Sequence, residues 1–395
     1  MMIQAVLGNP NHPEYGVATI PFPIPHDQYA HCMELLEALE IGDAVKTDCK
    51  VEKIDSFYTV LKRAEMLTVN VEELNYLAKR LESFDTGEAA QFQAMAHKLE
   101  LFELKDLINL TFCCQQATVI TDFSDLAAVG RDHYMNLHGG SASVDELNKL
   151  DGEETARRLI ENGSGKITPY GVVYDNGMKL EQVYDGRFFP CYYYEPNVIT
   201  VAVTSKAEPE DTEHITWMYL PMVQEEIDRA LLRGGITDPA DVRLRLEDSQ
   251  LPNEVDILLD MECETLSDLN ELAAATDGLS KADMEKLGAV VTLAKPQNAE
   301  QIKNLVENLD LFDFAPGAHT PEEYGKYMIQ QSGHFDYDEN LDAFYDYEKY
   351  GTERMNEEDG MFTDRGYVAY KGYYSMEEVM NESQSSHMEM GGLSR

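Results

Sequence analysis

Acidic side chains between His334 and Tyr370 show the spacing that first suggests a function. At 100° per residue on a helical wheel, the carboxylates that fall in one narrow sector are Glu339, Asp342, Asp346, Glu353 and Glu357. Lys349 is the only cation among them. A helix rises about 1.5 Å per residue, so the row would run for roughly 25 Å with neighbours about 5–6 Å apart. Each strand of duplex DNA carries one phosphate per roughly 3.4 Å, a linear charge density of the same order.

This segment predicts an acidic helix followed by a strand. The expected buried face holds Leu341, Phe344, Tyr345 and Met355, although Glu348 falls on the same side. Gly351 is expected to bend or interrupt the helix. Further acidic candidates for a binding surface are Asp336, Asp338, Glu322 and Glu323. An acidic helical face is more often just the solvated side of a domain, so the row alone does not establish a function.

Other chemistry-bearing patterns are weak. HGGS at His138–Ser141 has no matching GxSxG turn, which favours a plain loop. NGSGK at Asn162–Lys166 lacks the full phosphate-loop spacing and predicts a helix C-cap and turn. The ten histidines include no HxxxH pair, and FDYDEN lacks the glycine and final glutamate of a calcium loop. We therefore predict no catalytic residue, no cofactor and no metal site, with a metal-dependent enzyme as the least favoured alternative.

Net charge favours a basic partner. The chain has 73 acidic and 31 basic side chains, a formal net charge of −42 that is spread over both halves. Such a chain is repelled by nucleic acid and by anionic membranes and is steered toward basic surfaces, of which nucleic-acid-binding clefts are the commonest. General solubility and adaptation to high salt are the competing explanations. The second fits poorly, because lysine is common and 43% of the residues are hydrophobic.

The length of 395 residues predicts two or more domains. No apolar run has the length of a membrane span, and the N-terminal residues lack the pattern of a signal peptide. Six cysteines show no CxxC spacing, and Cys113 and Cys114 are adjacent. This usage predicts reduced thiols and a cytoplasmic location.

The first half reads as two strands at Ile3–Gly8 and Gly16–Ile24, a helix at Asp27–Glu40 and a strand at Cys49–Ile54. Three helices follow: one that Asn70 caps, and two near 87–99 and 103–110. Ser124 is expected to cap the next helix, and a further helix and the strand YGVVY end the half.

The same order of elements then begins again. FPIPHDQYAHCMELL corresponds to LPMVQEEIDRALL, and VEELNYLAKRL corresponds to LSDLNELAAAT, which pairs Asn75 with Asn270. Gly130 pairs with Gly325, and Gly171 with Gly366, both 195 positions apart. We predict an α+β fold that is elongated and modular, built from two tandem copies of a small sheet-plus-helices unit. The expected domains are residues 1–190, residues 191–380 and a disordered tail at 381–395.

The second copy, from about Thr216 to Tyr370, resembles the ArdA antirestriction proteins of conjugative plasmids and transposons. The residues that carry this resemblance lie in EYGKYMIQQSG, LDAFYDYEKYG and GMFTDRG, and they are Tyr324, Gly325, Tyr327, Gly333, Leu341, Asp346, Tyr347, Tyr350, Gly351, Phe362 and Gly366. In the first copy, the counterpart of the acidic helix lacks the tyrosines and contains Arg157 and Arg158.

The resemblance implies an elongated, dimeric protein whose surface carboxylates imitate DNA phosphates, and which performs no chemistry. Its implied partner is a type I restriction-modification enzyme, at the modification and specificity subunits, with no direct binding of nucleic acid. The chain is expected either to form a homodimer or, through its two copies, to form an intrachain pseudo-dimer. The alternative is an acidic interaction protein for another basic target, such as a CRISPR effector or a nucleoid protein.

Overall fold

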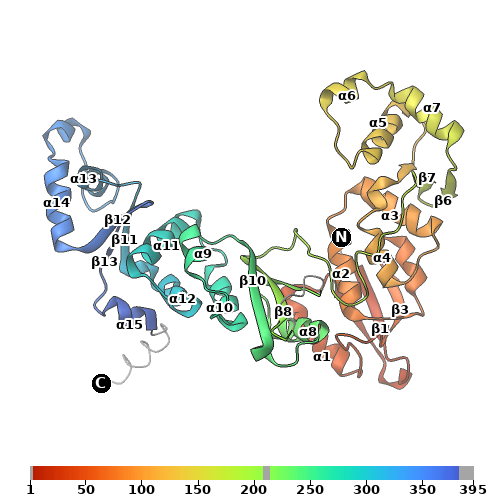
Figure 1. Cartoon of the computed structure of the whole chain (residues 1–395), viewed down its shortest axis with the longest axis horizontal. Helices are drawn as coiled ribbons and strands as arrows, with labels where there is room; N and C mark the ends of the chain where they lie inside the picture. Colours follow the sequence, from red (N-terminus) through yellow and green to blue (C-terminus); the bar gives the residue numbers. More distant parts are fainter. Residues whose placement is uncertain (1–2, 208–213, 382–395) are drawn as a thin grey trace. The chain divides into compact units, whose positions relative to one another are not determined.

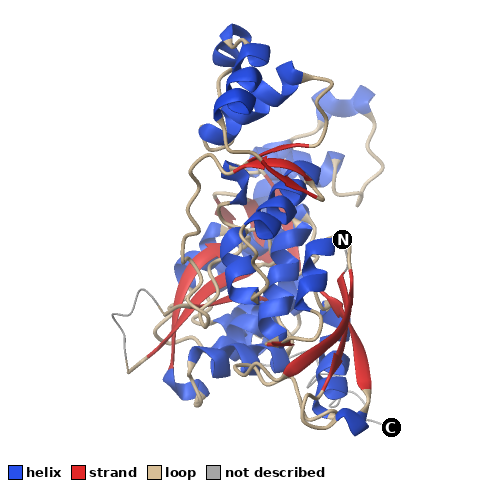
Figure 2. Cartoon of the chain, turned by 90° about the vertical axis from the view of Figure 1, so that its right-hand side faces the viewer, coloured by secondary structure: helices blue, strands red, loops and turns tan. Residues whose placement is uncertain are grey.

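The structure is a computed structural model that describes residues 3–207 and 214–381 (Figure 1). Short antiparallel sheets and helices recur along the chain (Figure 2), which confirms the predicted α+β fold. The described residues divide into two compact units. One holds 3–194, 214–216 and 223–239, and the other holds 195–207, 217–222 and 240–381.

The first unit begins with a four-stranded sheet and one helix. The sheet has the order β2-β1-β3-β4, with β1 (Ile3–Gly8), β2 (Val17–Phe22), β3 (Cys49–Asp55) and β4 (Thr68–Val69). β1 pairs antiparallel with both β2 and β3. Helix α1 (Tyr29–Glu37) follows β2, and the short 3-10 helices are η1 (Pro13–Tyr15), η2 (His26–Gln28) and η3 (Thr59–Ala64).

Three helices form the middle of this unit: α2 (Val71–Glu82), α3 (Thr86–Lys98) and α4 (Leu104–Leu110). The Asn70 side chain accepts a hydrogen bond from the Glu73 backbone N–H, so the predicted cap of α2 is confirmed. Asp85 and Glu88 form a capping box at the start of α3. These caps satisfy backbone donors that a helix start leaves without partners.

The last part of the first unit is a second sheet with a helical insertion. The sheet has the order β5-β7-β6, with β5 (Thr118–Ile120), β6 (Lys166–Thr168) and β7 (Gly171–Tyr174), and η4 (Cys114–Gln116) precedes it. Between β5 and β6 lie α5 (Leu126–Leu137), α6 (Val144–Lys149) and α7 (Gly152–Asn162). The prediction that Ser124 caps α5 was wrong by one residue. Asp125 is the cap, and the Ser124 hydroxyl instead donates to the carboxylate of Asp122.

Two loops of this region have the structures predicted for them, a plain loop after α5 and a helix C-cap after α7. His138–Gly140 form a turn after α5, in which Gly139 and Gly140 have positive φ. α7 ends at Asn162, and Gly163 caps it through its N–H to the carbonyl of Leu159. The predicted C-cap is confirmed.

The second half has a similar order of elements, although its first sheet has three strands instead of four. A sheet of order β10-β8-β9 contains β8 (Ile199–Ser205), β9 (Thr216–Leu220) and β10 (Val242–Ser249), with α8 (Gln224–Gly234) and η5 (Pro239–Asp241) in between. The helices α9 (Asn253–Leu258), α10 (Leu266–Thr276), α11 (Lys281–Ala294), α12 (Ala299–Glu307) and η6 (Leu309–Leu311) follow. The final sheet has the order β11-β13-β12, with β11 (Phe312–Pro316), β12 (Asp359–Thr363) and β13 (Gly366–Tyr370). It is accompanied by α13 (Pro321–Gln330), η7 (Glu339–Phe344), α14 (Tyr347–Glu357) and α15 (Met376–Asn381).

Residues paired in the sequence comparison make the same contacts in both halves. Asn75 accepts a hydrogen bond from the N–H of Ile24 at 2.8 Å, and Asn270 accepts one from Met222 at 2.8 Å. The hydroxyls of Thr168 and Thr363 each donate to the carbonyl of a glycine three residues on, at 2.8 Å. Those glycines, Gly171 and Gly366, have φ of 126° and 140°.

Helix α8 belongs to the second half of the sequence but lies in the first compact unit. Its Arg233 is only 5% exposed, and the guanidinium donates to the carbonyl of Ala44, to Asn70 and to the hydroxyl of Tyr184. Arg229 forms an ion pair with Glu72 of α2. A buried guanidinium needs this many acceptors, because an unpaired buried charge is costly.

All six cysteines are free thiols, and four of them are buried. Across residues 3–207 and 214–381, none of the helices has the length and apolar character needed to cross a membrane. The predicted disordered tail begins at Asn381, which ends α15; its other residues, 382–395, lie outside the described part of the chain.

Candidate protein-binding surface

The acidic surface predicted from the sequence is built on α13, η7 and α14. Thr320 caps α13 by accepting a hydrogen bond from the N–H of Glu323 at 3.2 Å, and Pro321 occupies the first turn. The Glu323 carboxylate accepts from the N–H of His319 at 2.8 Å, which lowers its pKa. Glu322 and Glu323 are both exposed at the positive end of the helix dipole, where carboxylates are favoured.

Two glycines let α13 and α14 cross with their backbones in contact. A Cβ atom on Gly325 would lie 2.0 Å from the carbonyl oxygen of Tyr347, and one on Gly351 would lie 1.8 Å from that of Pro321. Both distances are far below any normal carbon–oxygen contact. Gly351 is buried inside α14 and does not interrupt it, so the predicted break at this residue was wrong.

Tyrosines form the support beneath this crossing. The buried Tyr324 of α13 stacks at a tilt on Tyr367 of β13, with ring centroids 4.2 Å apart, and Tyr350 and Phe362 pack against the same cluster. The Tyr324 hydroxyl donates to Glu358 at 2.6 Å, and Arg354 forms an ion pair with the same carboxylate. Burial raises the pKa of Tyr324, so it remains a neutral donor. Most residues that carry the family resemblance therefore build the scaffold.

Asp342 is the centre of a hydrogen-bond hub. Its carboxylate accepts from the hydroxyl of Tyr337 at 2.7 Å, from the amide of Gln330 at 2.8 Å and from the hydroxyl of Tyr347. The hydrogen bonds from Tyr347 and Tyr337 lower the pKa of Asp342, and the bond to Asp342 raises the pKa of Tyr337. The hub joins α13, η7 and α14, so Asp342 holds the surface together as well as contributing charge to it.

A single acidic helix over this segment was a wrong prediction. η7 ends at Phe344, Tyr345 is extended with ψ of 129°, and α14 begins only after Asp346. Asp346 is the N-cap, and its side chain accepts from the N–H of Lys349 at 3.1 Å. Aspartate competes for nearby backbone donors in this way and so favours helix starts over helix interiors.

The expected buried face was also partly wrong. Leu341 and Phe344 are 47% and 84% exposed, whereas Tyr345 and Met355 are partly buried. Glu348, which the helical wheel placed on the buried side, is exposed. Because η7 has 3-10 geometry and Tyr345 breaks the helical phase, the wheel does not apply across the whole segment.

All nine predicted acidic candidates are exposed, but they differ in what they contact. Asp338 and Asp346 cap helices, Asp342 centres the hub, and Glu353 lies 4.0 Å from Lys349. The candidates that accept no hydrogen bond and form no ion pair with a described residue are Glu322, Asp336, Glu339 and Glu357. Residues 320–358 carry eleven carboxylates against three cations, Lys326, Lys349 and Arg354, for a formal net charge of −8.

The corresponding helices of the first half have the same crossing but less charge. A Cβ atom on Gly130 would lie 1.8 Å from the carbonyl of Gly152. Residues 125–163 hold eight carboxylates and four cations, a formal net charge of −4. Arg157 and Arg158 each pair within α7, with Glu153 and Glu154.

The sequence did not identify Glu348 as an exposed acidic candidate, nor the role of Tyr337 and Tyr347 as hydrogen-bond donors in the hub. The spacing of Tyr337, Asp342 and Tyr347, five residues apart each time, was a signal that a helical wheel does not detect. Within the described residues, no group of three or more histidine, cysteine, aspartate or glutamate side chains is placed to hold a metal ion.

Residues 212–369 match the family model described as Antirestriction protein (ArdA). The resemblance predicted for about Thr216–Tyr370 is thus confirmed, and this part of the chain is similar to ArdA antirestriction proteins. It contains every one of the nine acidic candidates and the whole hub. A search of curated proteins gives no match to the chain.

Proposed function

We propose that this protein is an antirestriction protein that binds type I restriction-modification enzymes in place of DNA. The observation that carries the proposal is the surface of residues 320–358, where ten of eleven carboxylates are exposed against three cations, inside the segment that matches the ArdA family model. A strongly basic cleft is the partner that such a surface fits.

The mechanism is competitive binding without a chemical step. Lysine and arginine side chains that contact DNA phosphates in the modification and specificity subunits would contact carboxylates of this surface instead. Glu322, Asp336, Glu339 and Glu357 are exposed and have no hydrogen-bonded or ion-paired partner among the described residues, so they can meet such cations without first breaking an internal contact. A surface that imitates only the phosphates carries no base sequence, so enzymes of different sequence specificity would be inhibited alike.

The two halves support a tandem duplication, with copies at residues 1–190 and 191–380. The sheets at the ends of the halves have equivalent orders, β5-β7-β6 and β11-β13-β12, and each helix pair crosses at two glycines. Helix α8 of the second copy is built into the unit formed by the first, which favours an intrachain pseudo-dimer over association of two chains. Sedimentation equilibrium tests this point: a monomer that inhibits fully supports the pseudo-dimer, and inhibition that requires a dimer contradicts it.

Competition with DNA tests the main proposal. The protein is titrated into a purified type I methyltransferase bound to fluorescent DNA, at 50 and 200 mM salt. Displacement should weaken steeply with salt, because both surfaces release counterions when they meet. DNA that stays bound at the lower salt with excess protein would exclude type I enzymes as the partner. The same assay with a CRISPR effector or a nucleoid protein then tests the alternative of another basic target.

A matched pair of variants locates the surface. Charge reversal of Glu339, Glu353 and Glu357 to lysine should raise the concentration needed for displacement by at least 100-fold, while it leaves the caps and the hub in place. The control reverses three exposed glutamates of α7, Glu153, Glu154 and Glu161. Both variants change the net charge equally, so equal loss in both would show that total charge matters and that this surface does not.

A further inference from the structure

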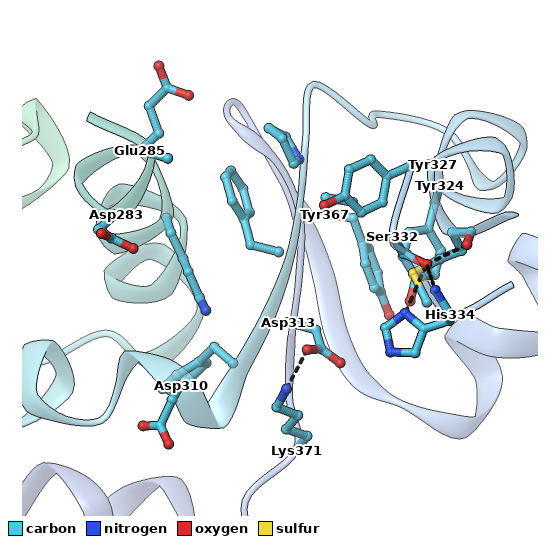
Figure 3. A pocket seen from close by; sticks show the side chains of 17 residues that line it. Asp283, Glu285, Asp310, Asp313, Tyr324, Tyr327, Ser332, His334, Tyr367 and Lys371 are labelled. Atoms are coloured by element: carbon cyan, nitrogen blue, oxygen red, sulfur yellow. Dashed lines mark hydrogen bonds and ion pairs between the residues drawn. The ribbon is translucent and has the colours of Figure 1, made fainter. Parts of the chain in front are cut away.

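A groove in the second unit exposes the edge of a sheet. Its volume is about 380 Å³, and it is lined by the start of α11, by Asp310 and residues 312–316, and by α13 (Figure 3). α11 packs on one face of the β11-β13-β12 sheet, and α13 and α14 pack on the other. β11 is an edge strand in this order, so the groove lies along the side of β11 that has no neighbouring strand.

The register of the sheet shows which backbone groups face the groove. The N–H of Lys371 donates to the carbonyl of Leu311, and the N–H of Gly317 donates to that of Arg365. Antiparallel ladders alternate, so residues 313 and 315 also bond to β13 while Phe312 and Phe314 direct their carbonyls away from it. The Phe312 N–H is taken by the carbonyl of Leu309, but both polar backbone groups of Phe314 face outward.

The first half covers one carbonyl of the equivalent edge. The carbonyl of Ala117, 195 positions before Phe312, accepts hydrogen bonds from the side chain of Gln91 at 2.7 Å and from that of Asn136 at 3.0 Å. In the second half the position of Gln91 is taken by Lys286. No side chain among residues 3–207 and 214–381 donates to the Phe312 carbonyl. Proteins cover or block sheet edges to prevent strand addition. The difference between the halves is confined to this carbonyl, because the backbone of Val119, the counterpart of Phe314, likewise forms no hydrogen bond to a described residue beyond the sheet.

Acidic side chains that line the groove indicate which kind of peptide segment it would bind. Asp283, Glu285 and Asp310 line it without forming an ion pair to a described residue, whereas Asp313 is neutralised by Lys371 at 2.6 Å. Lys286 is the remaining cation. It is half-buried and forms no hydrogen bond to a described residue, so its ammonium group can donate to the carbonyl of an incoming chain. Three carboxylates against one cation favour a basic segment.

We propose that the free edge of β11 binds an extended segment of a partner protein, with alternating basic and apolar residues, as an added strand. The backbone of the segment would bond to Phe314 and to the Phe312 carbonyl, and its lysines or arginines would meet Asp283, Glu285 and Asp310. None of these acids belongs to the surface proposed to imitate DNA. The strand-addition site and the antirestriction function therefore succeed or fail independently.

Peptide binding to the full chain tests the proposal. The probe is a fluorescein-labelled peptide of alternating lysine and valine, seven residues long, measured by fluorescence polarisation. Two control peptides are the same sequence methylated at every central amide nitrogen, which cannot add as a strand, and a version with glutamate in place of lysine. Both controls should bind at least tenfold more weakly. Equal binding by the methylated peptide would overturn the proposal, because charge attraction alone would then explain the result.

Two substitutions of Phe314 distinguish the contribution of its backbone N–H to peptide binding from that of its aromatic ring. Phe314→Pro removes the outward N–H without removing a hydrogen bond to β13. It should weaken binding of the lysine-valine peptide at least tenfold. Phe314→Ala keeps the N–H, so its affinity for the lysine-valine peptide should lie within about threefold of that of the unmodified protein. Unchanged binding by Phe314→Pro contradicts the proposal. Sedimentation of the same proteins tests the other occupant: a dimer that Phe314→Pro converts to a monomer would assign the edge to a second copy of the chain.

Discussion

Substitution of Gly351 by alanine tests whether the crossing of α13 and α14 holds the acidic surface in place. The new Cβ atom would lie 1.8 Å from the carbonyl oxygen of Pro321, 2.8 Å from its carbon and 3.0 Å from the nitrogen of Gly325. These are backbone atoms that cannot rotate away. Contacts shorter than 3.0 Å are essentially absent from real structures, so the two helices must separate by more than 1 Å at this point.

Two opposing effects set the magnitude. Alanine is favoured over glycine inside a helix by up to about 1 kcal/mol. Overpacking of this kind costs about 1–3 kcal/mol, and separation of the helices also loosens the packing of Tyr350 and Met355, each worth about 1.5–3 kcal/mol when fully buried. Because both side chains are only partly buried, we expect a net loss of about 2–3 kcal/mol.

Hydrogen exchange measured by mass spectrometry gives the local stability. The free energy of opening of α14 should fall by that amount in Gly351→Ala, and displacement of DNA from a type I methyltransferase should weaken at least tenfold although every carboxylate is retained. Gly87→Ala is the matched control. Its nearest contact is the Asp85 side chain at 3.2 Å, so helix propensity should make it neutral or stabilising. If Gly351→Ala behaves like Gly87→Ala, the reasoning about the crossing is wrong.

Three other substitutions have defined outcomes. Asp342→Asn should increase hydrogen exchange in η7 with little change in the first unit, because Tyr337, Tyr347 and Gln330 all donate to Oδ1 and a neutral amide oxygen is a weaker acceptor than a carboxylate. Unchanged exchange would show that the hub is not structural. Arg233→Met should destabilise the first unit by about 3 kcal/mol in urea denaturation, since buried acceptors lose their donors, and a change below about 1 kcal/mol would contradict this role. Burial lowers the pKa of His133 in the folded state. The contribution of neutral His133 to the free energy of unfolding should therefore be fully present above pH 6.5 and be lost as the pH drops through the lowered folded-state pKa. His133→Gln should show a smaller loss of unfolding free energy between pH 7 and pH 5, and an identical loss would refute the assignment.

Local signals in the sequence predicted much of the fold. Asn70 caps α2 as expected, because a side-chain acceptor before an apolar helical pattern satisfies an otherwise unpaired N–H. The pairing of Asn75 with Asn270 identified equivalent hydrogen bonds. The pairing of Gly130 with Gly325 identified equivalent helix crossings, although the sequence did not show which helices would cross there. These features depend on one residue and its immediate contacts, so pattern analysis can find them.

The acidic surface was predicted in composition but not in geometry. All nine carboxylates are exposed, yet the helical wheel assumed one continuous helix where Tyr345 is extended and Asp346 begins a new one. The hub on Asp342 depends on three residues that come together only when α13, η7 and α14 are in place. Such tertiary contacts leave no periodic signal. The covered carbonyl of Ala117 and the open carbonyl of Phe312 were likewise found only from the register of both sheets.

The placement of α8 determines how this chain can be divided. A fragment that ends at residue 190 would lack the helix that brings Arg233 to Asn70 and Tyr184, and would leave those buried acceptors and the apolar surface under Ile227 and Leu231 open to water. The complementary fragment would carry the same helix without its binding site. Expressed together, the two fragments should reassemble as a split protein. The docking of α8 into its binding site on the first fragment would make their association specific.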